Sequence, residues 1–130
     1  ARRPIEIEIA GLAAERATPE QLAALEEANT DLEHAPDLEH AVDADVRFHR
    51  LLAEATGNPI FVLLLETLAQ LLRESRRRTI KRAGKQLALD EHRKILATIR
   101  TGDREGARQA MQFHMQLIAR DLDLDRTQRL

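Results

Sequence analysis

Four ionisable side chains occupy positions of this sequence where apolar side chains would be expected. Asp45 and His49 lie four residues apart. The apolar stripe around them, spaced by threes and fours, consists of Leu38, Val42 and Leu52. Residues four apart share one face of a helix, so the carboxylate and the imidazole project together. Burying such groups costs several kcal/mol unless they pair with each other or bind a ligand.

Two further histidines lie on apolar stripes nearer the end of the chain. The stripe of His92 contains Leu89, Leu96 and Ile99, and that of His114 contains Ala107, Met111 and Ile118. A turn at Gly102 separates the two segments, and His92 lies ten residues before it and His114 twelve residues after it. At a rise of about 1.5 Å per residue, both lie roughly 15–18 Å from the turn. We therefore expect the two imidazoles to face each other at a similar height.

Three neutral imidazoles and one carboxylate form a donor set for a single divalent ion. Such donors suit Zn²⁺, Ni²⁺, Mn²⁺ or Fe²⁺, with zinc as the first expectation, and the sequence has no cysteine to supply a thiolate. Core histidines held only by hydrogen bonds are the alternative, and the pattern alone leaves both open. His34 and His40 lie off the stripes beside a loop, so we predict that they are exposed and have no role in the site.

Long helices must position these residues. The 130-residue chain is 43% hydrophobic and 32% charged and has only three Phe and no Trp or Tyr, which predicts one domain over residues 1–130 with an aliphatic core. Its five Gly and four Pro separate about six predicted helices, at residues 4–16, 19–34, 37–56, 59–81, 86–100 and 103–122. Short connections favour antiparallel neighbours. The predicted fold is therefore all-α, an antiparallel bundle of about six helices.

Composition excludes several functions. The net charge of −2 and the isoelectric point near 6.2 argue against direct binding of DNA by these residues. No stretch approaches the roughly 20 apolar residues that cross a bilayer, and no apolar run near Ala1 is typical of a signal peptide. We expect a cytoplasmic protein that has no membrane partner.

Several motifs resemble a known family. The segments DVRFH (45–49) and LAEATGNP (52–59) resemble the signature of FCD domains, the effector-binding domains of FadR-type transcription regulators in the GntR family. The segments AAERAT (13–18), EHRKIL (91–96) and ARQAM (107–111) with HM (114–115) resemble other parts of the same domain. The resemblance extends over nearly the whole chain.

The resemblance implies a dimeric helical bundle that senses a small molecule. In metal-containing members an Asp and three His bind the ion, and these correspond to Asp45, His49, His92 and His114. The resemblance also implies a small organic acid as the effector. Such a ligand fits a divalent centre, which favours an anionic oxygen ligand. An arginine would hold the carboxylate.

Three residues are candidates for contacting the effector. Arg2 matches an arginine near the start of the family's first helix, and Asn58 lies where it could reach the rim of a pocket. Arg76 belongs to a basic run with Arg73, Arg77 and Arg78, for which an exposed helix face is the alternative interpretation.

Three functions compete on this evidence. We predict a non-catalytic sensor domain that modulates DNA binding by a full-length regulator through the family's N-terminal winged helix-turn-helix. The sequence begins at Ala1 without that domain, which favours an excised effector domain. A small metal-dependent hydrolase or isomerase is the alternative, but it needs a general base beside the metal, and we expect Glu91 to point elsewhere. The third possibility is a dimerisation bundle whose buried polar groups only fix helix register.

Overall fold

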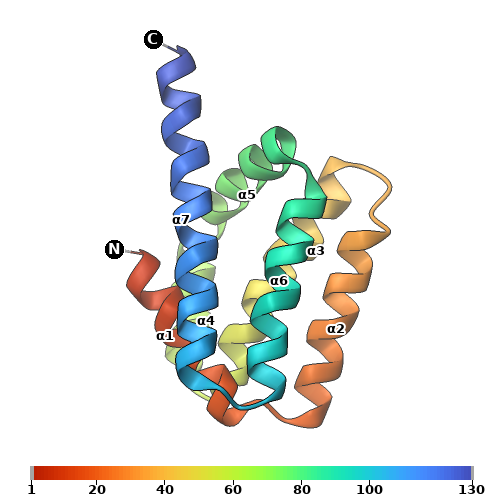
Figure 1. Ribbon diagram of the computed structural model, residues 1–130, viewed down its shortest axis with the longest axis vertical. Coiled ribbons are helices and arrows are strands. Elements are labelled where there is room, and N and C mark those ends of the chain that lie inside the picture. The colour runs from red at the N-terminus through yellow and green to blue at the C-terminus, as the bar shows by residue number, and fades with distance from the viewer. Residues whose placement is uncertain (1, 130) are drawn as a thin grey trace.

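Helices make up the whole of the architecture that the structure describes. The computed structural model describes the backbone of residues 2–129 and the side chains of residues 5–120, and within this range it has seven helices and no strand. The helices are α1 (Arg2–Arg16), α2 (Pro19–Glu33), α3 (Leu38–Ala55), α4 (Pro59–Thr67), α5 (Ala69–Ala83), α6 (Lys85–Arg100) and α7 (Arg104–Arg129) (Figure 1). The predicted all-α bundle is confirmed.

The residues at the helix starts explain most of these bounds. Thr18 and Gln21 form a capping box at α2, and Pro19 occupies the first turn. The Asp37 side chain accepts the His40 N–H at the start of α3. Asn58 caps α4 by accepting the Ile60 N–H. Each of these side chains satisfies a backbone donor that has no partner inside its own helix.

The predicted helix over residues 59–81 is in fact two helices. The chain bends at Leu68, whose backbone (φ −97°, ψ 10°) departs from helical values and ends α4. No Gly or Pro marks this break. The bend has a packing reason: it lets Leu65 of α4 and Leu72 of α5 both reach the main core from helices that run in different directions. The last helix also continues beyond the predicted end at residue 122, to Arg129.

Helix α3 lies in the middle of the bundle and contacts α1, α2, α4, α5 and α6. The first and last helices, α1 and α7, pack against each other, and α6 lies between α2 and α7 (Figure 1). The C-terminal part of α7 extends beyond the rest of the bundle. A side chain on the inner face of α3 can therefore meet side chains from several other helices.

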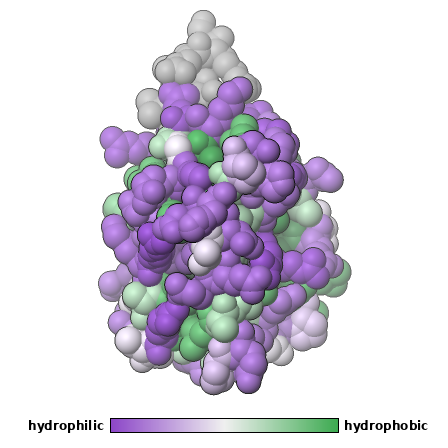
Figure 2. All heavy atoms as spheres, turned by 90° about the vertical axis from the view of Figure 1, so that its right-hand side faces the viewer, coloured by the Kyte–Doolittle hydropathy of each residue, from purple (hydrophilic) through white to green (hydrophobic). Residues whose placement is uncertain are grey.

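The core is aliphatic, as its composition predicts. Its largest fully buried apolar side chains include Ile9, Leu25, Leu52 and Ile95, and the one fully buried aromatic ring among the described residues is Phe48. The face shown in Figure 2 is largely hydrophilic, with apolar atoms scattered between charged ones. Among the described residues, no helix combines the length and the hydropathy that a membrane span requires.

Candidate metal centre

The structure brings the four predicted ligands together at the centre of the bundle. Asp45 and His49 come from α3, His92 from α6 and His114 from α7. Each of the four is less than 5% exposed. The stripes that the sequence predicts are thus the buried faces of these three helices.

The distances between the four side chains are short. Asp45 Oδ1 lies 3.3 Å from His49 Nε2 and 3.1 Å from His92 Nε2. One ring nitrogen from each of His49, His92 and His114 lies within 4.8 Å of the others. The rings of His92 and His114 are 5.3 Å apart between centroids, which confirms their predicted similar height.

The converging atoms are buried polar groups without hydrogen-bond partners. This holds, among the described side chains, for Asp45 Oδ1 and for the Nε2 atoms of His49, His92 and His114. The Asp45–histidine separations are short, but none of them has hydrogen-bond geometry. Buried polar atoms are rarely left unpaired, so three close imidazoles with a carboxylate beside two of them need an explanation. A divalent ion with N₃O coordination fits these donors.

Two further charged residues complete the buried cluster: Glu6, which the sequence did not reveal as part of the site, and Arg76, which was predicted only as a contact for the effector. Glu6 of α1 lies with Oε1 3.3 Å from His49 Nδ1. Arg76 of α5 donates from Nη2 to Glu6 Oε1 at 3.1 Å, and its Nε lies 3.8 Å from Asp45 Oδ1. Both side chains are 2% exposed. The signal for Glu6 was present in the sequence, because it lies three, four and seven residues before the core residues Ile9, Ala10 and Ala13.

The buried charges influence one another strongly. Burial raises the pKa of Glu6, but the positive charge of Arg76 and the close contact with His49 outweigh it and lower the pKa to about 2. Burial also raises the pKa of Asp45, yet His92 and His49 hold it well below its ordinary value. Two carboxylates therefore face one guanidinium in a site with little solvent. The cluster has an excess negative charge, which a cation would offset.

The three histidines differ in protonation. Burial lowers the pKa of His92 and holds that of His114 well below the ordinary value, so both rings are neutral and able to bind a metal ion. Burial and Arg76 also lower the pKa of His49, but contacts with Asp45 and Glu6 reverse the effect and raise it. His49 is therefore the imidazole of the three that most readily takes up a proton.

The prediction that Glu91 points away from the site is wrong. Glu91 is 3% exposed, and its Oε1 lies 4.0 Å from His114 Nδ1. Burial raises the pKa of its carboxyl group. Helix α6 contacts α1, α2, α5 and α7, so its buried face is wide enough to include two consecutive residues, Glu91 and His92.

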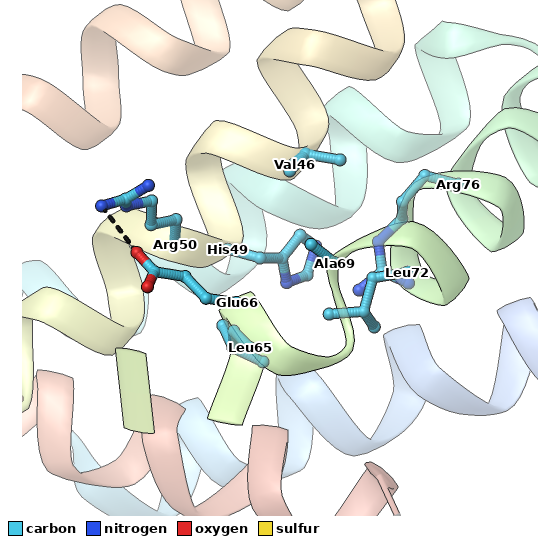
Figure 3. Close-up of a pocket in the computed structure, with 8 residues that line it drawn as sticks. All are labelled: Val46, His49, Arg50, Leu65, Glu66, Ala69, Leu72 and Arg76. Carbon is cyan, nitrogen blue, oxygen red and sulfur yellow. Dashed lines mark ion pairs between the residues drawn. The ribbon is translucent and has the colours of Figure 1, made fainter. Parts of the chain in front are cut away.

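A cavity of about 90 Å³ lies beside the cluster, between α3, α4 and α5. His49 and Arg76 line one side, and apolar groups from Val46, Leu65, Ala69 and Leu72 form much of the remaining wall (Figure 3). An ion pair between Arg50 and Glu66, 3.0 Å apart, lies at the opposite side. The cavity has room for several waters or a small ligand.

The predicted effector residues lie in different environments. Arg76 lines the cavity, and its Nη1 has no hydrogen-bond partner among the described residues. Asn58 is exposed, and its side-chain oxygen caps α4. The side chain of Arg2 lies outside the described residues.

The rest of the basic run is on the surface of α5. Arg73 pairs with Glu39 and Asp43, Arg77 with Glu39, and Arg78 with Glu74. The exposed-face interpretation therefore holds for these three arginines and is wrong for Arg76. His34 and His40 are exposed, as predicted.

The chain is similar in sequence to known regulatory proteins. The chain is 34% identical over 111 residues to the HTH-type transcriptional repressor NanR of Salmonella schwarzengrund, an alignment that covers 82% of this chain and 42% of the relative. It is also 34% identical over 130 residues to a putative L-lactate dehydrogenase operon regulatory protein of Escherichia coli K12. That alignment covers 91% of this chain and 47% of the relative. The chain thus spans less than half the length of these relatives.

A solved structure has the same fold. The GntR protein of Streptococcus agalactiae superimposes with a TM-score of 0.78 and 34% sequence identity, covering 92% of this chain and 55% of that one. These relatives are transcriptional regulators, which agrees with the prediction that the chain is not an enzyme. The hydrolase or isomerase alternative is therefore not favoured. The FCD domain family matches residues 1–117, and on this evidence, together with the shared fold, the chain belongs to the FCD domain family.

Proposed function

We propose that this chain is the sensor domain of a transcription regulator and binds one divalent metal ion and a small carboxylate effector. Asp45, His49, His92 and His114 hold the ion, which we propose to be zinc, with nickel, manganese or iron as alternatives. The observation that carries the proposal is a buried group of three imidazole nitrogens within 4.8 Å of one another, with Asp45 Oδ1 beside two of the three histidines, in which these atoms have no hydrogen-bond partners. A hydrogen-bonded polar core would have paired them.

The effector class follows from the charge of the centre. Three neutral imidazoles, one carboxylate and a divalent ion have a combined charge of +1, which favours an anionic oxygen ligand in a site sheltered from water. Arg76 supports the same class, because Nη1 is an unused donor on a side chain that lines the cavity. The cavity volume of about 90 Å³ limits the effector to a small acid. Arg2 and Asn58 stay candidates for further contacts.

The role in regulation rests on the relatives. Because the chain spans less than half of each relative's length, we propose that a DNA-binding domain precedes it in the full protein. We also propose that the protein acts in the cytoplasm, where a transcription regulator meets DNA. Effector binding would favour one arrangement of the helices, or of two paired chains, and so change how the DNA-binding domains are presented.

The test combines metal analysis with a thermal-shift screen. Protein purified without added metal should contain about one divalent ion per chain, and the variants His92→Ala and His114→Ala should lose it. His34→Ala is the matched control, because His34 is an exposed histidine on α2's C-terminal cap, and it should keep the ion. Less than about a tenth of an ion per chain in the unmodified protein would end the proposal.

The screen then uses small mono-, di- and tricarboxylates, with and without a chelator. It includes L-lactate, because one relative is named for an L-lactate dehydrogenase operon. We expect at least one acid to raise the melting temperature, and we expect the chelator to abolish that rise. A rise that persists after the chelator has removed the ion would show that the effector does not bind through the metal.

A further inference from the structure

Each imidazole has two ring nitrogens, and the partner of one nitrogen decides what the other can do. A carboxylate that accepts a hydrogen bond from one N–H fixes the tautomer and the ring orientation, and it makes the opposite nitrogen a better metal ligand. The groups that face the ring nitrogens pointing away from the cluster therefore decide how each histidine could bind an ion.

The three histidines differ in this respect. His49 Nδ1 lies 3.3 Å from Glu6 Oε1. His114 Nδ1 lies 4.0 Å from Glu91 Oε1, and Glu91 is also shared with Lys94, whose Nζ lies 3.7 Å from Oε2. Neither His49 Nδ1 nor His92 Nδ1 makes a hydrogen bond among the described residues, and the His92 ring stacks on Phe48 with centroids 4.1 Å apart and planes at 5°. Glu6 is thus the carboxylate nearest to an outward-facing imidazole nitrogen.

Arg76 limits where Glu6 can move. Its Nη2 lies 3.1 Å from Oε1 and 3.5 Å from Oε2 of Glu6, while its Nε lies 3.8 Å from Asp45 Oδ1. The guanidinium therefore links Glu6, which lies beside His49 Nδ1, to Asp45, which lies beside His49 Nε2. Three helices, α1, α5 and α3, contribute to this arrangement, and all of its side chains are at most 4% exposed.

A simpler role for Glu6 is to neutralise Arg76 alone. That role needs contact with the guanidinium and none with an imidazole. In the structure the same oxygen, Oε1, is the atom nearest to both Arg76 Nη2 and His49 Nδ1. A counter-charge on its own does not account for this placement.

We propose that Glu6 is a positioning residue of the metal site. It accepts a hydrogen bond from His49 Nδ1, which leaves Nε2 unprotonated and directed at the ion, and Arg76 holds Glu6 in place. This inference rests on the proposed function, because it requires that His49 binds a metal ion. It predicts a graded series in which loss of Glu6 weakens metal binding more than loss of Glu91.

The test measures Zn²⁺ affinity by competition with a chromogenic chelator. Glu6→Gln should bind Zn²⁺ about 10- to 100-fold more weakly than the unmodified chain, the range found for residues that orient metal ligands. Glu8→Gln is the matched control, because Glu8 lies on the same helix and pairs with Arg108 at the surface. It should leave the affinity unchanged, and Glu91→Gln should give a smaller loss than Glu6→Gln.

A second readout separates positioning from stability and does not require any variant to fold. Nitrogen-15 NMR of the unmodified chain with Zn²⁺ should show His49 protonated at Nδ1 and bound through Nε2. A His49 bound through Nδ1 overturns the inference. So does a Glu6→Gln variant that melts at a lower temperature yet binds Zn²⁺ normally, because Glu6 would then only neutralise Arg76. Failure of the unmodified chain to bind Zn²⁺ at all is a different result, which rejects the proposed function itself.

Discussion

The chemistry of individual residues here depends on how each polar group is partnered. Buried groups such as Glu6 and Asp45 keep their charge only because Arg76 and the histidines are close by. At the surface, Asp37 and His40 interact in a simpler way. The Asp37 carboxylate accepts the backbone N–H of His40 and lies 2.8 Å from His40 Nδ1. This pair caps the helix that carries Asp45 and His49.

At this scale we predict a pH effect at the start of α3. The hydrogen bond that the His40 ring donates to the Asp37 carboxylate, together with the charge of that carboxylate, raises the pKa of His40 above 6.5, and Asp43 adds to the effect. A raised folded-state pKa means that protonated His40 stabilises the fold fully below its unfolded pKa, and this contribution is lost as pH rises through the folded pKa. An NMR titration of the histidine rings should show the raised pKa.

Asp37→Asn is the matched variant for this titration. Asparagine is also a good helix cap, so α3 should still begin at the same residue. The pKa of His40 should nevertheless fall toward 6.5, because the charge is gone. An unchanged His40 pKa in this variant would contradict the assigned cause.

At the scale of the elements, the turn between α3 and α4 joins the helix that carries two of the proposed metal ligands to the wall of the cavity. Thr56 is buried, and its hydroxyl donates to the Ala53 carbonyl at 2.6 Å, while Arg16 donates to the Thr56 carbonyl at 2.8 Å. Gly57 follows with φ +72°, a left-handed conformation that side chains with a Cβ atom disfavour. The direction in which α4 leaves α3 depends on this residue.

We predict that Gly57→Ala lowers the free energy of unfolding by about 1 kcal/mol. A Cβ atom at this position would meet nothing within 4 Å, so the cost is backbone strain alone. Gly57→Asn should cost less, because asparagine tolerates the left-handed region better. Urea denaturation of the three proteins measures the difference. An equal loss in both variants would show that a cause other than backbone strain decides their stability.

The elements that have local signals were predictable from the sequence. Thr18, Asp37 and Gly102 mark helix starts and turns through their own chemistry, and the buried His92 and His114 were identified by helical spacing and distance from the turn. The bend at Leu68 was not predictable in this way, because it serves the packing of Leu65 and Leu72 and carries no Gly or Pro.

The site was predictable only in part. Its four proposed ligands interrupt apolar stripes and are therefore visible in the sequence. Glu6 and Arg76 were not recognised as a pair, because 70 residues separate them and only the packing of α1 against its neighbours brings them together. The direction of the Glu91 side chain was predicted wrongly, because one apolar stripe in the sequence does not reveal that a helix is buried on several sides.

At the scale of the whole molecule, α4 and the start of α5 present an apolar surface. Ile60, Leu63 and Leu71 are 55%, 57% and 66% exposed. A twofold dimer places the same residues of two chains face to face, and apolar side chains can meet their own copies without charge repulsion. We therefore propose that a second copy of this chain covers these three residues.

We predict that Leu63→Asp converts a homodimer into a monomer, because it would bury two like charges in the shared interface. Analytical ultracentrifugation measures the mass directly. Phe113→Asp is the matched control, since Phe113 is also half exposed but lies on α7, and it should leave the dimer intact. An unmodified chain that sediments as a monomer would contradict the proposed interface.

The packing of α1 on α7 has a consequence for how the chain is made. Glu8 and Arg108, which join the two helices, are 100 residues apart. At a synthesis rate of about 5–20 residues per second, the ribosome adds α7 roughly 5–20 seconds after α1. During that interval Ile9, Ala10 and Ala13 lack the helix against which α1 finally packs. Helix α1 is therefore made before the other helices of this bundle but is among the last of them to be fully covered.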